Sequence, residues 1–107
     1  MAEKQLTIFG ACVNALGPVK GANVVTFIGH WALTMEKAGD RWDLMTKTAQ
    51  VEYYGTVAGL SRSQAFRNFA RYRQVFKTDP TALIRKAGIV VKTEKQANDV
   101  WTIGLAT

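Results

Sequence analysis

The chain has 107 residues, of which 48% are hydrophobic, so it can build one modest core and is neither disordered nor long enough for two domains. Its net charge of +6 is unevenly placed: residues 1–60 carry five cations and five acids, and residues 61–107 carry nine cations and three acids. This asymmetry predicts a neutral packing half joined to a surface for nucleic acid or another acidic partner.

A single cysteine, Cys12, excludes an intrachain disulfide, and its apolar surroundings predict a buried thiol. No run reaches the roughly 18 consecutive apolar residues that cross a bilayer. Glu3 and Asn14 interrupt the pattern of a signal peptide. We therefore expect a cytoplasmic protein that makes no membrane contact.

The first expected element is an amphipathic helix over residues 5–16. Leu6, Phe9, Val13 and Leu16 share one side of it, and Gly17-Pro18 ends it. Two roles remain open for this apolar stripe. It packs in the core, or it forms the contact of a homodimer.

A second helix is expected from an Asn23 cap to Ala38, with Gly39 as its stop. Its segment VVTFIGHWAL is apolar nearly all round, as in the most buried helix of a small domain. His30 has no second ligand-type residue at metal-binding spacing, so we expect neither a metal nor another cofactor. Trp42 is expected to plug the core from the short link that follows.

The stretch over residues 49–77 predicts two helices joined by a tight turn. Thr46 or Thr48 caps the first, which runs to about Ala58, and Gly59 makes the turn. Gly55 is costly within a helix, which suggests that the two helices approach closely there. Strong helix, glycine turn and basic helix together are typical of a helix-turn-helix, whose second helix enters the DNA major groove.

The second of these helices, residues 61–77, begins at a Ser61 cap and carries five cations and no acid. At 100° per residue its apolar and aromatic residues gather on one side and its donors on the other. The inward side holds Ala65, Phe69, Tyr72 and Phe76, and the outward side holds Ser63, Gln64, Arg67, Asn68, Arg71 and Gln74.

A basic face without acids repels itself and is favourable against a polyanion, although a merely solvated face is the simpler alternative. Arginine suits guanine, and asparagine or glutamine suits adenine. We assign base contacts to Arg62, Ser63, Gln64, Arg67 and Asn68, and phosphate contacts to Arg71, Arg73, Lys77 and Thr48.

After Lys77, Thr78 or Asp79 caps a helix that starts with Pro80 and runs to about Ala87 before Gly88. The β-prone runs IVVKT and VWTIGL then predict a hairpin wing over residues 89–105. This wing would bring Lys92, Lys95 and Lys86 to the DNA backbone. The alternative is a last helix over residues 94–101 and no wing.

The segment GLSRSQAFR resembles the turn and the start of the recognition helix in bacterial and phage helix-turn-helix regulators. With YY-x4 before it and FARYRQVF and TDPTALI after it, the pattern is similar to small helix-turn-helix proteins of actinobacteria and their phages, over about residues 31–84. The resemblance implies DNA binding in a bacterial host cell, in association with the nucleoid. It places Arg62, Ser63, Gln64, Arg67 and Asn68 at the DNA-facing positions, while Gly55 departs from the usual Ala.

The sequence thus predicts a mainly α, single helix-turn-helix domain over residues 1–107, with about five helices and a C-terminal wing. The expected function is sequence-specific binding of double-stranded DNA, with transcriptional regulation as the process. The alternative is a phage-type interaction module that binds a host protein. An enzyme is not expected, because GPVKG lacks the spacing of a phosphate loop and one His and one Cys supply no catalytic set.

Overall fold

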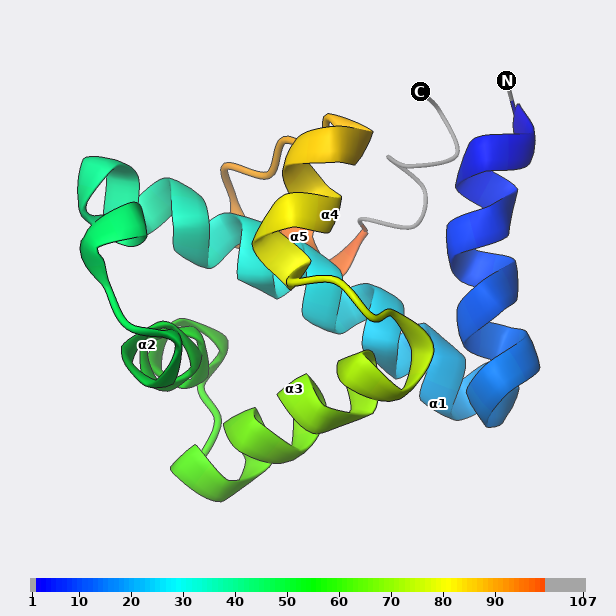
Figure 1. Ribbon diagram of the computed structural model, residues 1–107, viewed down its shortest axis with the longest axis horizontal. Helices are drawn as coiled ribbons and strands as arrows, with labels where there is room; N and C mark the ends of the chain where they lie inside the picture. The colour runs from blue at the N-terminus through cyan, green and yellow to red at the C-terminus, as the bar shows by residue number, and fades with distance from the viewer. Residues whose placement is uncertain (1, 100–107) are drawn as a thin grey trace.

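A computed structural model describes the backbone of residues 2–99 and the side chains of residues 10–99. The protein is mainly helical, and no strand occurs within residues 2–99. Figure 1 shows α3 along the lower edge, α4 above it and the long α1 crossing behind both. The elements in chain order are α1 (Ala2–Ala38), the 3-10 helix η1 (Gly39–Leu44), α2 (Lys47–Ala58), α3 (Arg62–Val75), α4 (Pro80–Ala87) and α5 (Glu94–Asn98).

The N-terminal helix is sharply broken at Gly17, whose φ of 87° and ψ of 168° are not helical. Its two segments therefore run in different directions, upright and then across the molecule in Figure 1. Gly17 was correctly expected to end the first segment. The cap expected at Asn23 was wrong, because the second segment resumes at Pro18, whose fixed φ suits a first helical turn.

Gly21 lets the two segments of α1 touch. A Cβ atom placed on Gly21 would lie 2.8 Å from the backbone carbon and nitrogen of Cys12 and Val13, respectively. Cys12 is fully buried, as expected, and burial raises the pKa of its thiol to about 11. The thiol is therefore protonated and unreactive at neutral pH.

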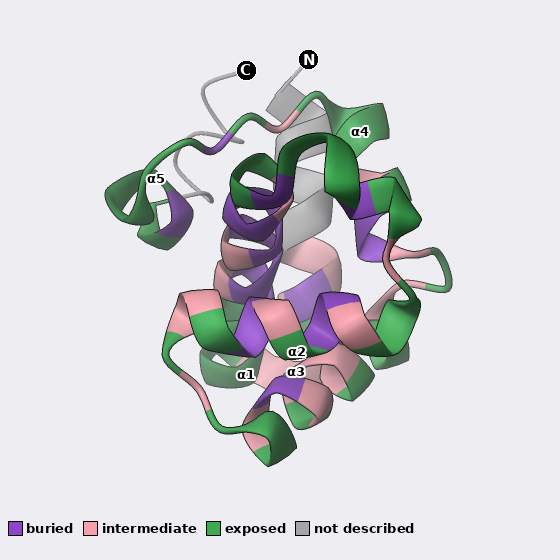
Figure 2. Ribbon diagram, turned by 90° about the vertical axis from the view of Figure 1, so that its left-hand side faces the viewer, coloured by how far each residue is buried: buried purple, intermediate pink, exposed green. Residues whose placement is uncertain are grey.

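The core gathers around the second segment of α1, as its apolar sequence predicts. The Phe27 ring lies 4.9 Å from Tyr54 of α2 and 5.4 Å from Tyr72 of α3 (centroid distances). Trp31 lies 5.6 Å from Phe69 of α3 in a stacked arrangement. In Figure 2 the buried residues of α1, α2 and α3 face one another inside the domain.

The region Gly10–Leu44 contains an 18-residue window with a mean hydropathy of 1.2, long and apolar enough by composition to span a membrane. Core helices of globular domains pass the same test. Phe27, Ile28 and Trp31 of this helix are buried against the rest of the domain, whereas 33% of the apolar window as a whole is buried.

The helix ends follow the capping signals of the sequence. Thr46 rather than Thr48 caps α2, with its hydroxyl accepting from the Ala49 N–H at 3.1 Å. Ser61 caps α3 through the Gln64 N–H at 3.2 Å. Asp79 rather than Thr78 caps α4, accepting from the Thr81 N–H at 2.8 Å, and Pro80 is its first residue.

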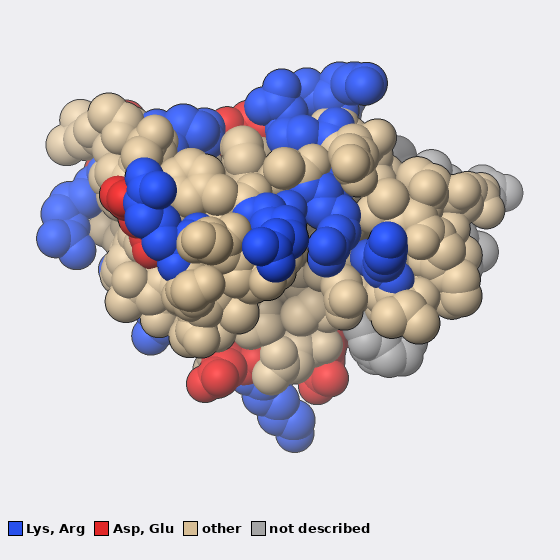
Figure 3. All heavy atoms as spheres, turned by 90° about the horizontal axis from the view of Figure 1, so that it is seen from below, with Lys and Arg blue, Asp and Glu red and all other residues tan. Residues whose placement is uncertain are grey.

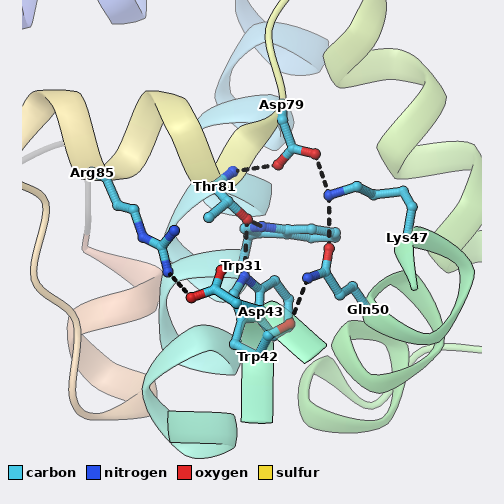
Figure 4. Close-up of polar contacts among 8 residues, drawn as sticks. All are labelled: Trp31, Trp42, Asp43, Lys47, Gln50, Asp79, Thr81 and Arg85. Carbon is cyan, nitrogen blue, oxygen red and sulfur yellow. Dashed lines mark hydrogen bonds and ion pairs between the residues drawn. The ribbon is translucent and has the colours of Figure 1, made fainter. Parts of the chain in front are cut away.

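A buried polar network, the tryptophan network, fastens α4 to the domain (Figure 4). The Thr81 hydroxyl accepts from the indole N–H of Trp31 at 3.1 Å and from that of Trp42 at 3.0 Å. The Gln50 amide donates to the Trp42 carbonyl at 2.9 Å, and Lys47 donates to the other end of Gln50 at 2.7 Å. Lys47 also forms an ion pair with Asp79, which closes the network.

The C-terminal region differs from the expected wing. Residues 89–92 form no strand, and the segment expected as the hairpin turn is helix α5, capped by Thr93. Thr93 accepts from the Gln96 N–H, and the Gln96 side chain accepts from the Lys92 N–H at 2.8 Å, so local bonds favour a helical turn there. For residues 94–98 the structure therefore agrees with the alternative prediction of a last helix and not with the hairpin. The second β-prone run, residues 100–105, lies outside the described residues.

Candidate nucleic-acid interface

Two helices, α2 and α3, form a compact unit around a tight glycine turn. Gly59 adopts the left-handed conformation at φ 71°, and the Leu60 N–H donates to the Gly55 carbonyl at 2.8 Å. A Cβ atom added to Gly55 would lie 3.0 Å from the Cβ of Ala65. The helices therefore meet at these two small residues, as the sequence predicted.

Helix α3 separates its two sides as the 100° periodicity predicted. Ala65 and Tyr72 are fully buried, and Phe69 and Phe76 are half-buried against the core. The helix ends at Val75 rather than Lys77, with Phe76 as its C-cap in an extended conformation.

The outward side of α3 is accessible, and no acid lies on the helix. Ser63, Arg67 and Arg73 are exposed, whereas Gln64, Asn68 and Arg71 are half-buried. Figure 3 views the molecule from the side of α3: Lys and Arg atoms cross the middle of this face, and Asp and Glu atoms lie toward its margins.

Arg62 is drawn toward α2 rather than standing free. Its Nε donates to Glu52 Oε2 at 2.7 Å, and its guanidinium lies 4.7 Å from the centre of the Phe66 ring. Both partners of this ion pair are largely exposed, so the pair is weak and can open. A base contact by Arg62 would require it to leave Glu52.

Four side chains form a continuous hydrogen-bonded row along α3. Arg67 donates to Gln64 at 3.1 Å, Gln64 donates to Asn68 at 2.7 Å, and Asn68 donates to the Tyr54 hydroxyl at 3.1 Å. Burial raises the pKa of Tyr54, an effect that the Asn68 hydrogen bond partly offsets. The row fixes the direction of the amides that the sequence assigned to bases.

The remaining expected contacts divide into two groups. Thr48 in the first turn of α2 and Arg73 and Lys77 near the end of α3 are all exposed to solvent. Lys92 and Lys95 are also exposed, but they belong to the region of α5, which packs on α1 above α3 in Figures 1 and 2. The structure does not bring these two lysines, expected on a wing, to the face of α3. Lys86 lies on α4, on the same upper part of the domain.

A cavity of about 290 Å³ opens beside α3, where the second segment of α1 stands opposite. Its α1 residues are Asn23, Thr26 and His30, which the sequence did not predict as part of a site. They are spaced three and four residues apart, which places them on one side of a helix. That spacing could have indicated a polar side on this otherwise apolar helix. The α3 residues Gln64, Asn68 and Arg71 line the opposite wall.

His30 belongs to no group of metal-ligating side chains among the described residues. Its Nδ1 lies 3.0 Å from the carbonyl oxygen of Thr26, which can only accept, so Nδ1 carries the proton. Among the described residues no group of three or more His, Cys, Asp or Glu side chains could hold a metal ion.

Comparison with known proteins gives no relative: no family model, no curated protein and no solved structure matches this chain.

Proposed function

We propose that the protein binds double-stranded DNA sequence-specifically, with α2 and α3 acting as a helix-turn-helix and α3 entering the major groove. The observation that carries this proposal is the outward side of α3, which is accessible, basic and free of acids. Helix N-terminal Arg, Ser, Gln and Asn side chains are the residue types that reach base edges. Regulation of transcription is the process that such binding would serve.

The geometry of the turn supports the same proposal. Close packing of Gly55 on Ala65 and the left-handed Gly59 hold α3 at a fixed angle to α2. The core side of α3 is buried, so the helix can be presented to a groove without exposing apolar surface. An ordinary solvated helix would instead mix acids with bases to gain i,i+4 pairs.

The row from Arg67 to Tyr54 gives this surface a defined geometry. Gln64 and Asn68 are held by neighbours before any ligand arrives, so little side-chain entropy is lost on binding. Arg67 stands at the exposed end of the row and has further donors for a guanine edge.

The decisive experiment selects bound fragments from random duplex DNA at moderate salt and then measures affinity for the selected site. Arg67→Ala should weaken binding by about 1–3 kcal/mol and relax specificity at one position. Arg41→Ala is the matched control, because it removes the same charge from an exposed residue of η1. Equal affinity of the wild type for every duplex would contradict the sequence-specific proposal.

The same experiment addresses oligomeric state and the competing class of function. A palindromic site would indicate a two-fold dimer. The N-terminal stripe proposed for a homodimer begins in residues 5–9, whose side chains lie outside the described part of the chain. A stoichiometric protein partner, together with no salt-sensitive retention on DNA, would instead favour the protein-interaction module.

A further inference from the structure

The cavity between α1 and α3 is lined by both polar and apolar residues. Asn23, Thr26 and His30 come from α1, Gln64, Asn68 and Arg71 from α3, and Tyr54 from α2; Phe27, Ala58 and Leu60 supply apolar lining.

Several donors in these walls have no partner within the described residues. Arg71 makes no ion pair or side-chain hydrogen bond there, and neither does the Asn23 amide or the Thr26 hydroxyl. Gln64 and Asn68, by contrast, already bond to each other. The free donors therefore belong to both helices and face one cavity.

The charge of the cavity favours an anion. Arg71 is its one cationic residue of the Lys or Arg type, and no Asp or Glu is among the lining residues. A half-buried guanidinium with neutral amide and hydroxyl donors beside it suits the oxygens of a phosphate group. A volume of about 290 Å³ leaves room for such a group and for bridging waters.

We propose that this cavity is a phosphate-binding site, in which Arg71 supplies the charge and Asn23 and Thr26 supply hydrogen bonds from α1. The phosphate can come from the DNA backbone, since the cavity opens beside the outward side of α3, or from a free phosphate ester. The first source rests on the proposed function, whereas the second does not. Either source gives α1 a part in binding that its apolar sequence does not suggest.

The first arm of the test uses the full chain and a labelled duplex, with dissociation constants measured across a series of salt concentrations. Asn23→Asp sets a carboxylate against Arg71 and should weaken binding about tenfold or more. The slope of log K against log salt should fall by about 1, as for one lost phosphate contact. Asn14→Asp is the matched control, because it makes the same change at an exposed position of the other segment of α1.

The second arm needs no DNA. Inorganic phosphate, and separately a nucleoside monophosphate, is titrated into the protein at constant ionic strength while NMR follows the Asn23 side-chain amide and the Arg71 Nε–H. Saturable shifts are expected in the wild type and in the Asn14→Asp variant, and not in Asn23→Asp. Thr26→Val, which changes no charge, should weaken phosphate binding several-fold. It is the test variant to use if Asn23→Asp does not fold.

The two arms separate this proposal from the proposed function. If the wild type binds no DNA but phosphate shifts the cavity signals, the DNA function fails and a free phosphate ester is the ligand. If Asn23→Asp weakens DNA binding and free phosphate gives no shift, the DNA backbone is the source. Equal DNA affinities and slopes for both Asn variants, with no phosphate shifts, would overturn the site.

Discussion

The tryptophan network and the outward side of α3 are both rich in polar side chains, yet they differ in how those side chains are bonded. In the network, Thr81 accepts from two buried indoles, and Lys47 bonds to both Gln50 and Asp79 (Figure 4). On α3, the hydrogen bonds run from the exposed Arg67 to half-buried amides and leave further guanidinium donors facing solvent.

The difference teaches which polar residues hold the fold and which are available to a ligand. A buried donor that loses its acceptor costs the full free energy of desolvation, whereas an exposed donor exchanges its partner for water. Substitutions in the network should therefore change the free energy of unfolding. Substitutions on the outward side of α3 should change binding and leave the fold intact.

The largest effect is expected from Thr81→Val, which removes the acceptor shared by Trp31 and Trp42. Two buried indole N–H groups lose their partner, so the free energy of unfolding should fall by about 2–4 kcal/mol. Urea denaturation measures this loss. Thr81→Ser keeps the hydroxyl and should cost much less; a loss no larger in Thr81→Val than in Thr81→Ser would contradict a dominant part for the hydroxyl.

Arg67→Ala should weaken DNA binding and leave the stability of the fold nearly unchanged. Because Arg67 is exposed and bonds only to Gln64 among the described residues, the free energy of unfolding should change by no more than about 0.5 kcal/mol. Denaturation of this variant, beside its DNA affinity, tests the comparison directly. A destabilisation as large as that of Thr81→Val would mean that the row on α3 is part of the structural framework.

Protonation of Asp79 at low pH should weaken the tryptophan network and lower the free energy of unfolding. Burial opposes ionisation of this carboxyl, but hydrogen bonds from Lys47 and from the Thr81 N–H, together with the Lys47 charge, lower its pKa below the usual 3.8. A lowered folded-state pKa gives stability that is fully present above the unfolded value and is lost as the pH falls through the folded value.

Urea midpoints measured between pH 7 and pH 3 should therefore drop at the acid end, and Asp79→Asn should flatten that part of the profile. At pH 7 the same substitution should cost less than about 1 kcal/mol, because asparagine still caps α4 and the ion pair is partly exposed. An unchanged acid limb in Asp79→Asn would assign the pH dependence to other groups.

The smallest effect is expected from Glu52→Gln, which releases Arg62 from its exposed ion pair. Stability should change by no more than about 0.5 kcal/mol. DNA affinity should rise modestly, because Arg62 becomes free and the negative charge beside it on α2 is removed. Titration at low and at physiological salt measures this gain, which should shrink as salt rises. A loss of affinity would indicate that the Arg62–Glu52 pair itself positions a contact.

Local signals in the sequence predicted much of the fold. Ser61 acts through a bond to a near neighbour, and Pro80 and the glycines at 59 and 88 act through their own backbone angles, so their positions at helix ends could be recognised without the tertiary structure. The two sides of α3 followed from its periodicity. The hairpin wing was predicted wrongly for residues 89–98. β-propensity depends strongly on context, and the capping bonds that Thr93 and Gln96 make locally favour a helical turn there instead.

Features that depend on distant residues were not predictable. Nothing near Thr81 reveals that Trp31 and Trp42, 50 and 39 residues away, share its hydroxyl. The close crossing at Gly21 likewise depends on the angle of the chain at Gly17. In the candidate interface, the outward residues of α3 were found from sequence. The α1 wall of the cavity was not, because three polar residues in an apolar segment carry no partner information.

Because Trp31 and Trp42 both bond to the Thr81 hydroxyl, they can serve as intrinsic fluorescent probes of the protein. Trp31 stacks on Phe69 of α3 while its indole N–H bonds to α4, so its emission should respond to movement of either helix. With Trp101 replaced by phenylalanine, tryptophan fluorescence excited at wavelengths that tyrosine does not absorb would come from Trp31 and Trp42 alone. Docking of α4 and binding of a ligand on α3 could then be followed in real time without an attached dye.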